Sequence, residues 1–98
     1  MTETRTGYAV SGQPNGPSEN TLLLYDSPLY SQPSQQDVRA VIQQINFTGS
    51  QVANLVGVHP RTVRKWVSLP ETANHAPIPY AAWRLLLIAA RLAEPVIA

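Results

Sequence analysis

The sequence predicts an all-α protein of about four helices behind a flexible N-terminal arm. Three observations carry this prediction. Apolar residues recur at helical spacing in the segments after residue 33. Pairs of residues that cap helix starts stand before the first two of these segments. Glycine and proline fall where helices end or begin. We therefore expect an arm over residues 1–33 and one helical domain over residues 34–98.

Residues 1–33 have the composition of a flexible arm. They hold four of the nine prolines and three of the five glycines, and one Arg stands against three Asp or Glu residues. Such a segment has little apolar surface with which to fold alone. One apolar island, Thr21–Tyr25, has two interpretations. It is a segment that folds back over the core, which we favour, or a peptide that binds a partner.

The domain begins with an amphipathic helix. Ser34 and Asp37 form a capping pair, in which each side chain accepts a hydrogen bond from the other residue's backbone N–H. Apolar residues then follow at helical spacing: Val38, Val41, Ile42 and Ile45. We expect this helix to end near Asn46 and to support the two helices that follow it.

Residues 48–67 predict two short helices joined by a glycine turn. Thr48 and Gln51 form a second capping pair at the start of the first helix. The small Ala53 allows another helix to cross closely over this one. Gly57 falls where the helix should end, a position that favours the left-handed backbone conformation that glycine adopts at little cost.

The second of these helices has an apolar side and a basic side. It begins at Pro60, with His59 as its N-cap. Proline lacks a backbone N–H, but the N–H at the first helical position has no partner within the helix, so nothing is lost. At about 100° per residue, Val63, Trp66 and Val67 share one side. The opposite side holds Arg61, Arg64, Lys65 and Ser68, with Thr62 at its edge. Such a helix suits the major groove of DNA, where base-edge acceptors lie between two phosphate backbones.

Positive charge is concentrated here, although the whole chain has a formal net charge of only +1. Residues 38–70 contain no Asp or Glu, and their cations are Arg39, Arg61, Arg64 and Lys65. Clustered Lys and Arg indicate a nucleic-acid surface better than net charge does. The alternative, a basic surface that only meets solvent, agrees less well with this distribution.

The segment 48–67 resembles the helix-turn-helix of small phage and bacterial repressors. The matching residues are Ala53, Gly57, Val58, Val63 and Trp66. The resemblance implies that residues 60–67 are the recognition helix. Together with the basic side described above, it predicts these DNA-binding residues: Gln51, His59, Arg61, Thr62, Arg64, Lys65 and Ser68. His59 stands where Ser or Thr is more common, which leaves open whether it caps the helix or contacts DNA.

A loop rich in proline, residues 68–79, leads to a last helix expected over residues 80–93. The loop is a wing that contacts the neighbouring groove, or a connector; its lack of Lys and Arg favours the connector. The last helix is apolar almost all round, broken only by Arg84 and Arg91, so it must be buried.

Three short helices offer too little surface to cover this last helix, so we expect a homodimer through it. The predicted contact residues are Trp83, Leu86, Leu87 and Ala90. The alternative is that Leu22–Leu24 of the same chain cover the last helix. Residues 77–87 also resemble the C-terminal dimerisation region of anti-CRISPR-associated repressors, small phage proteins that silence the promoter of their own operon. The similarity rests on the Pro-Tyr entry into an apolar helix.

Other chemistry has little support. The chain has no Cys, which excludes disulfides and thiolate zinc sites. His59 and His75 have no acidic neighbour at catalytic or ligand spacing, and no glycine-rich phosphate loop is present. We predict a non-enzyme without catalytic residues, cofactor or metal. No apolar run of about 20 residues and no secretory signal appear, so we expect a soluble, cytoplasmic protein without a membrane partner.

These features together imply a sequence-specific transcriptional regulator that reads double-stranded DNA as a dimer, and we expect it to be a repressor. Two alternatives stay open. The scaffold could serve to bind and inhibit a host protein through the acidic arm and the last helix. The second alternative is an excisionase-like factor that bends DNA. A basic wing would favour this alternative, but the loop over residues 68–79 has no Lys or Arg.

Overall fold

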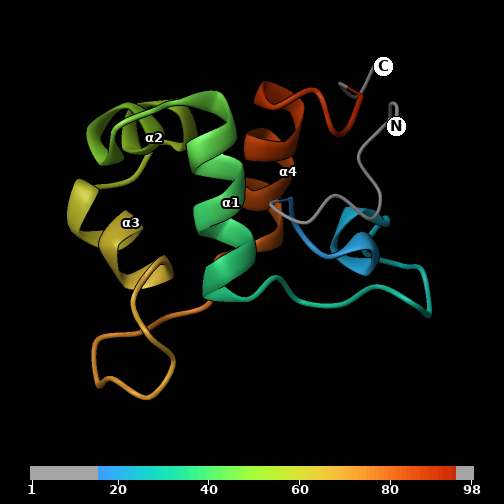
Figure 1. The fold of residues 1–98 in the computed structure, drawn as a ribbon, viewed down its shortest axis with the longest axis horizontal. Helices are drawn as coiled ribbons and strands as arrows, with labels where there is room; N and C mark the ends of the chain where they lie inside the picture. The colour runs from blue at the N-terminus through green and yellow to red at the C-terminus, as the bar shows by residue number, and fades with distance from the viewer. Residues whose placement is uncertain (1–15, 95–98) are drawn as a thin grey trace, which may run out of the picture.

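The computed structural model describes residues 16–94, and that part of the chain is helical without any strand (Figure 1). Its elements are η1 (Glu19–Leu22, a 3-10 helix), α1 (Gln35–Ile45), α2 (Gly49–Val56), α3 (Pro60–Trp66) and α4 (Tyr80–Ala89). The predicted all-α class with four helices is confirmed. No helix between residues 16 and 94 has both the length and the apolar character required to cross a membrane.

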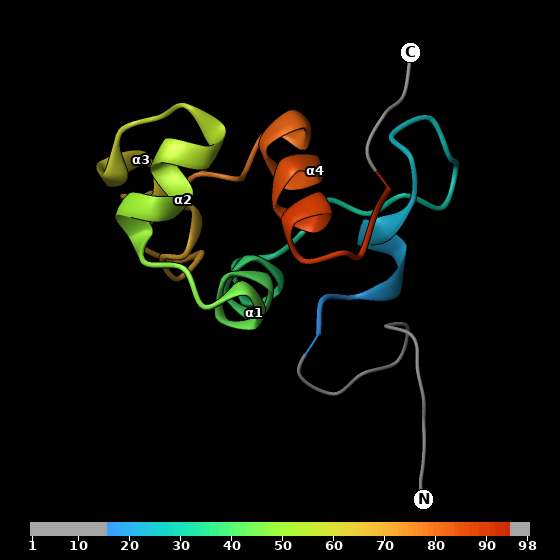
Figure 2. The ribbon, with the colours of Figure 1, turned by 90° about the horizontal axis from the view of Figure 1, so that it is seen from above.

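The helices α1 and α4 pack against each other at the centre of the molecule (Figures 1 and 2). The pair α2 and α3 lies on one side of them, with α2 also in contact with α4. The segment that contains η1 lies on the other side of α4, so α3 and η1 stand at opposite ends of the molecule (Figure 1).

Both predicted capping pairs are confirmed at the starts of α1 and α2. The Asp37 N–H donates to Ser34 Oγ over 3.2 Å, and the Ser34 N–H donates to Asp37 Oδ2 over 2.8 Å. The Gln51 N–H donates to Thr48 Oγ1 over 3.1 Å, and the Thr48 N–H donates to Gln51 Oε1 over 2.8 Å. Each pair satisfies two backbone donors that a helix start leaves unpaired.

Three helices are followed by a residue in the left-handed conformation. Asn46 has φ 58°, Gly57 has φ 78° and Arg91 has φ 61°. In each case the next residue's N–H returns to the carbonyl five positions back: Phe47 to Ile42, Val58 to Ala53 and Leu92 to Leu87. This arrangement satisfies carbonyls that the last helical turn leaves free and turns the chain sharply.

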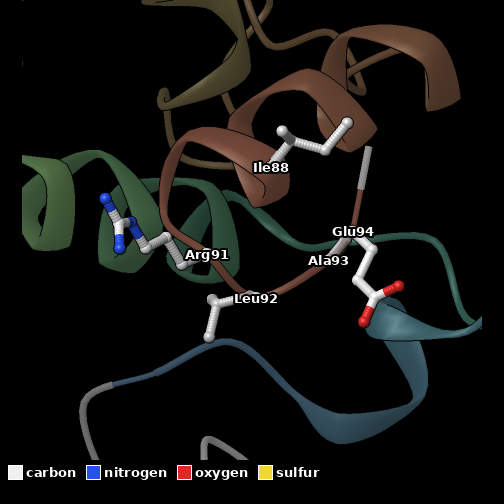
Figure 3. Close-up of a pocket in the computed structure, with 5 residues that line it drawn as sticks. All are labelled: Ile88, Arg91, Leu92, Ala93 and Glu94. Atoms are coloured by element: carbon white, nitrogen blue, oxygen red, sulfur yellow. The ribbon is translucent and has the colours of Figure 1, made fainter. Parts of the chain in front are cut away.

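The last helix is shorter than predicted. It was expected over residues 80–93, but α4 ends at Ala89. The left-handed turn at Arg91 redirects the chain, and Leu92 and Ala93 pack against the core from outside the helix. The apolar character of Leu92 and Ala93 therefore reflects their packing against the core and not a continuation of the helix. A shallow hollow at this turn is lined by Ile88, Arg91, Leu92, Ala93 and Glu94 (Figure 3).

The core takes side chains from one side of each α-helix and from the loop before α4. Its buried members are Val38, Val41, Val52, Ala53, Val63, Trp66, Ile78, Ala82, Trp83, Leu86 and Leu87. The predicted dimer contacts at Trp83, Leu86 and Leu87 are wrong, because all three side chains are 0% exposed within one chain. Of the four predicted contacts, Ala90 alone is half-exposed.

Much of the cover over α4 comes from the segment before α1. Trp83 Nε1 donates to the Thr21 carbonyl over 2.8 Å, and Arg84 Nη1 donates to the Leu22 carbonyl over 2.9 Å. Thr21 is 1% exposed. The island around Thr21 thus folds back over the core. Residues 1–15 of the predicted arm lie outside the described residues, and the boundary at residue 33 stays a prediction.

Three tyrosines attach the rest of this segment to the start of α4. The ring centroids of Tyr25, Tyr30 and Tyr80 are 5.1–5.6 Å apart. The Tyr25 N–H also donates to Tyr80 Oη over 3.1 Å. Beside this cluster, Leu24 and Leu29 keep 61% and 66% of their surface exposed. The segment therefore covers α4 and at the same time presents apolar side chains to solvent.

Candidate nucleic-acid interface

The turn between α2 and α3 sets the angle of the candidate recognition helix. Gly57, with φ 78°, allows its own N–H and that of Val58 to donate to the Ala53 carbonyl, over 2.8 and 3.0 Å. Ala53 itself is 3% exposed. The chain therefore turns from α2 into α3 within three residues, and α3 begins at Pro60. This is the helix, glycine turn and helix that the sequence predicted.

His59 caps the start of α3. The Arg61 N–H donates to His59 Nδ1 over 3.0 Å, and Pro60 occupies the first helical position. A neutral imidazole that accepts at Nδ1 carries its proton on Nε2. Since His59 is exposed, that Nε2–H remains available as a donor to a ligand outside the protein. Capping and DNA contact are therefore compatible at this residue.

The two predicted sides of α3 are confirmed. Val63 and Trp66 are each 3% exposed and belong to the core. Arg61, Arg64 and Lys65 are exposed on the helix. Because the apolar side is anchored in the core, the basic side has a defined orientation and faces away from the protein. The helix therefore presents its cations on one side.

Arg39 supports this helix from α1. Its Nε donates to the carbonyl of Val67, the residue that follows α3, over 3.0 Å, and to Gln35 Oε1 over 3.1 Å. A cation at the C-terminal end of a helix also offsets the partial negative charge there. Of the four cations between residues 38 and 70, Arg39 therefore has a supporting role within the fold.

The loop after α3 is held against the end of that helix. The Ala76 N–H donates to the Lys65 carbonyl over 3.1 Å, and His75 Nδ1 lies 2.9 Å from the Ser68 carbonyl. Ile78, 2% exposed, anchors the loop in the core. These contacts place Asn74 beside α3. One shallow hollow is lined by Arg61, Arg64, Lys65, Ser68 and Asn74.

The structure brings four of the predicted DNA-binding residues together in this hollow and leaves three outside its lining. Gln51, on α2, and His59 are exposed, whereas Thr62 is half-buried. Gln51 uses its Oε1 in the capping pair, which leaves its amide N–H groups as donors. Ser68 Oγ donates to the Arg64 carbonyl over 2.6 Å, so its proton is already used within the fold.

Asn74 is the residue of this surface that sequence reasoning missed. Its loop contains no Lys or Arg, and a loop sequence does not reveal which residue will return to a neighbouring helix. The hydrogen bonds from residues 75 and 76 to α3 and its end decide that placement. Within residues 16–94, no group of three His, Asp or Glu side chains is arranged to hold a metal ion.

Known proteins provide an independent comparison. The chain is similar to transcriptional repressors. It is 42% identical over 60 residues to a transcriptional repressor protein KorC of Escherichia coli, a match that covers 58% of this chain and 65% of that protein. A second KorC of Escherichia coli is 40% identical over 58 residues, which cover 56% of this chain and 62% of that protein.

These matches confirm the predicted resemblance to small transcriptional regulators. The chain spans just under two thirds of the length of the curated relatives it matches. No family model matches the sequence. The narrower resemblance to anti-CRISPR-associated repressors stays a prediction.

Proposed function

We propose that this protein is a transcriptional repressor that binds double-stranded DNA by inserting α3 into the major groove. The observation that carries this proposal is the exposed row of Arg61, Arg64 and Lys65 on a helix whose opposite side is fixed in the core. The similarity to KorC, itself named a transcriptional repressor, agrees with it. The backbone of a helix held in this way is already in place before binding, so only the side chains must become ordered.

In this proposal the three cations share two tasks, which are to contact base edges and to bind phosphates. Recognition helices present residues near their N-termini to base edges. Arg61, in the first turn of α3, is therefore placed to donate to guanine O6 and N7, the commonest specific contact of an Arg with DNA. Arg64 and Lys65, in the last turn, supply further readout and phosphate anchoring. His59 and Thr62 are secondary contacts, and Gln51 reaches phosphate from α2.

Binding to DNA tests this proposal directly. The purified protein is titrated into fluorescent duplexes at several salt concentrations, with single strands of the same sequence as the comparison. If a dimer neutralises about six phosphates, the logarithm of the binding constant falls with the logarithm of salt concentration at a slope of roughly −5. Folded protein that shows no affinity for any duplex, or a slope near zero, would contradict the proposal.

We further propose that two copies bind together, through a face of α4 other than the predicted one. Ala81, Leu85 and Ala89 are exposed at successive helical turns of α4, and Leu85 is 41% exposed. This apolar stripe is the part of α4 that the protomer leaves uncovered. A two-fold pair would read half-sites about 34 Å apart, and it would combine two weak sets of cationic contacts.

Leu85→Glu tests this dimer. The variant places a charge in the stripe, so we expect it to sediment at 10.7 kDa where the wild type sediments at twice that mass. Its melting temperature should change little, because the side chain is not in the core. Leu29→Glu is the matched control in the other exposed apolar segment. Loss of the dimer only in the Leu29→Glu variant would place the interface in the segment that contains Leu29. A monomeric wild-type protein would contradict the dimer itself.

The exposed segment that contains Leu24, Tyr25 and Leu29 supports one alternative function, the binding of a host protein. Tyr25 is 67% exposed, and its two leucine neighbours are similarly open. Adjacent large apolar side chains on the surface of a soluble protein often mark a site that binds another protein. Failure of the folded protein to bind DNA, with capture of one host protein that Leu24→Glu abolishes, would establish this alternative.

A further inference from the structure

We propose that Asn74 is a phosphate-contacting residue of the DNA surface, carried to α3 by the loop that follows it. The inference rests on the proposed function and adds a second element to the contact surface. Of the two interpretations of this loop, a wing or a connector, its lack of Lys and Arg favoured the connector. Its hydrogen bonds hold it against the end of α3.

The position of Asn74 follows from the contacts of the two residues after it. The next two residues return to the end of α3, through His75 Nδ1 to the Ser68 carbonyl and through the Ala76 N–H to the Lys65 carbonyl. The Ser68 carbonyl only accepts, so His75 is the donor and acts as a positioning residue. Asn74 is exposed at this point and lines the hollow with the cations of α3.

The end of α3 at which Asn74 lies indicates phosphate rather than base contact. Its loop is tied to Lys65 and Ser68, at the C-terminal end of the helix. Recognition helices contact base edges mainly with their N-terminal residues, so the opposite end faces the sugar–phosphate backbone. The Asn amide carries two N–H donors, which suit phosphate oxygens. The neighbouring Lys65 would hold the same phosphate or the adjacent one by charge.

A neutral phosphate contact has a distinct signature. It contributes a hydrogen bond but releases no counterion, so its loss should weaken binding to every duplex without changing the salt slope. Loss of Lys65, by contrast, should reduce the slope by about 0.9 for each phosphate it neutralises. Loss of a base contact should change the preference at one position of the site.

The test compares Asn74→Ala and Asn74→Asp with the control Asn20→Asp. Asn20 is also exposed, but it lies in η1 at the opposite end of the molecule (Figure 1). We expect Asn74→Ala to bind both selected and random duplexes about tenfold more weakly with an unchanged slope. Asn74→Asp, which sets a negative charge against phosphate, should bind at least about tenfold more weakly still. Asn20→Asp should bind like the wild type.

The outcomes separate this inference from the proposed function. Wild-type protein that binds no duplex overturns both. Wild-type binding together with equal affinity of Asn74→Asp and Asn20→Asp overturns the role of Asn74 alone. A loss that is confined to one base position overturns the assignment to phosphate. All three variants should melt at the wild-type temperature, since both positions are exposed.

Discussion

The triple change of Arg61, Arg64 and Lys65 to Ala should abolish specific duplex binding while leaving the fold intact. Contacts of Arg with bases are worth about 1–3 kcal/mol each, so three lost cations reduce affinity at least about a hundredfold. The salt slope should fall toward zero at the same time, because these cations release most of the counterions. The change is measured by fluorescence titration of labelled duplexes at several salt concentrations.

Stability should not change in step with affinity. All three side chains are exposed, and substitutions at such positions usually alter the free energy of unfolding by no more than about 0.5 kcal/mol each. Arg91→Gly is the charge control: it removes a cation from the turn after α4, and glycine accepts the φ of 61° there. Wild-type affinity in the triple variant, or an equal loss in Arg91→Gly, would show that α3 is not the contact surface.

Trp83→Ala should produce the largest loss of stability in the chain. The Trp83 side chain is 0% exposed and joins α4 to the Thr21 carbonyl through its indole N–H. Truncation of a buried Trp costs about 3–5 kcal/mol, against about 5–15 kcal/mol for the unfolding of a whole domain. We expect the variant to be largely unfolded near physiological temperature. Circular dichroism with urea titration measures the loss.

Trp83→Phe separates the two contributions of this side chain. It keeps most of the aromatic volume but leaves the buried Thr21 carbonyl without its donor, at a cost of about 1–3 kcal/mol. Its stability should therefore fall between the wild type and Trp83→Ala. A Trp83→Ala variant that unfolds at the wild-type urea concentration would mean that Trp83 is not a core residue.

Local signals in the sequence predicted the helices α2 and α3 and the turn between them. The capping pair Thr48 and Gln51, the glycine at position 57 and the proline at position 60 each act within a few residues, and the structure has all of them in the predicted roles. The side of α3 that is buried follows from its apolar spacing alone. These features depend on neighbours along the chain, which a single sequence displays directly.

Features that depend on distant contacts were not predictable in this way. The apolar residues of α4 indicated burial, but not whether the cover came from the same chain or from a partner. The structure assigns Trp83, Leu86 and Leu87 to the protomer core and leaves Leu85 exposed. Asn74 likewise reaches α3 through contacts that its loop sequence does not display.

The left-handed turn at Arg91 was equally hidden from the sequence. Arg is a good helix former and neither of its neighbours signals a stop, so helical spacing alone extended the last helix to residue 93. The turn is stabilised by the Leu92 N–H, which donates to the Leu87 carbonyl over 2.8 Å, and by burial of the residues that follow.

Selection from a random library of duplex DNA tests the central claim most directly. Purified wild-type protein and the triple Arg61, Arg64 and Lys65 variant are each carried through the selection, and the bound duplexes are sequenced. We expect the wild type to enrich a two-fold-symmetric motif with half-sites about one helical turn apart, and the variant to enrich none. Folded wild-type protein that enriches no sequence, or a variant that enriches the same motif, would contradict the claim that α3 reads DNA.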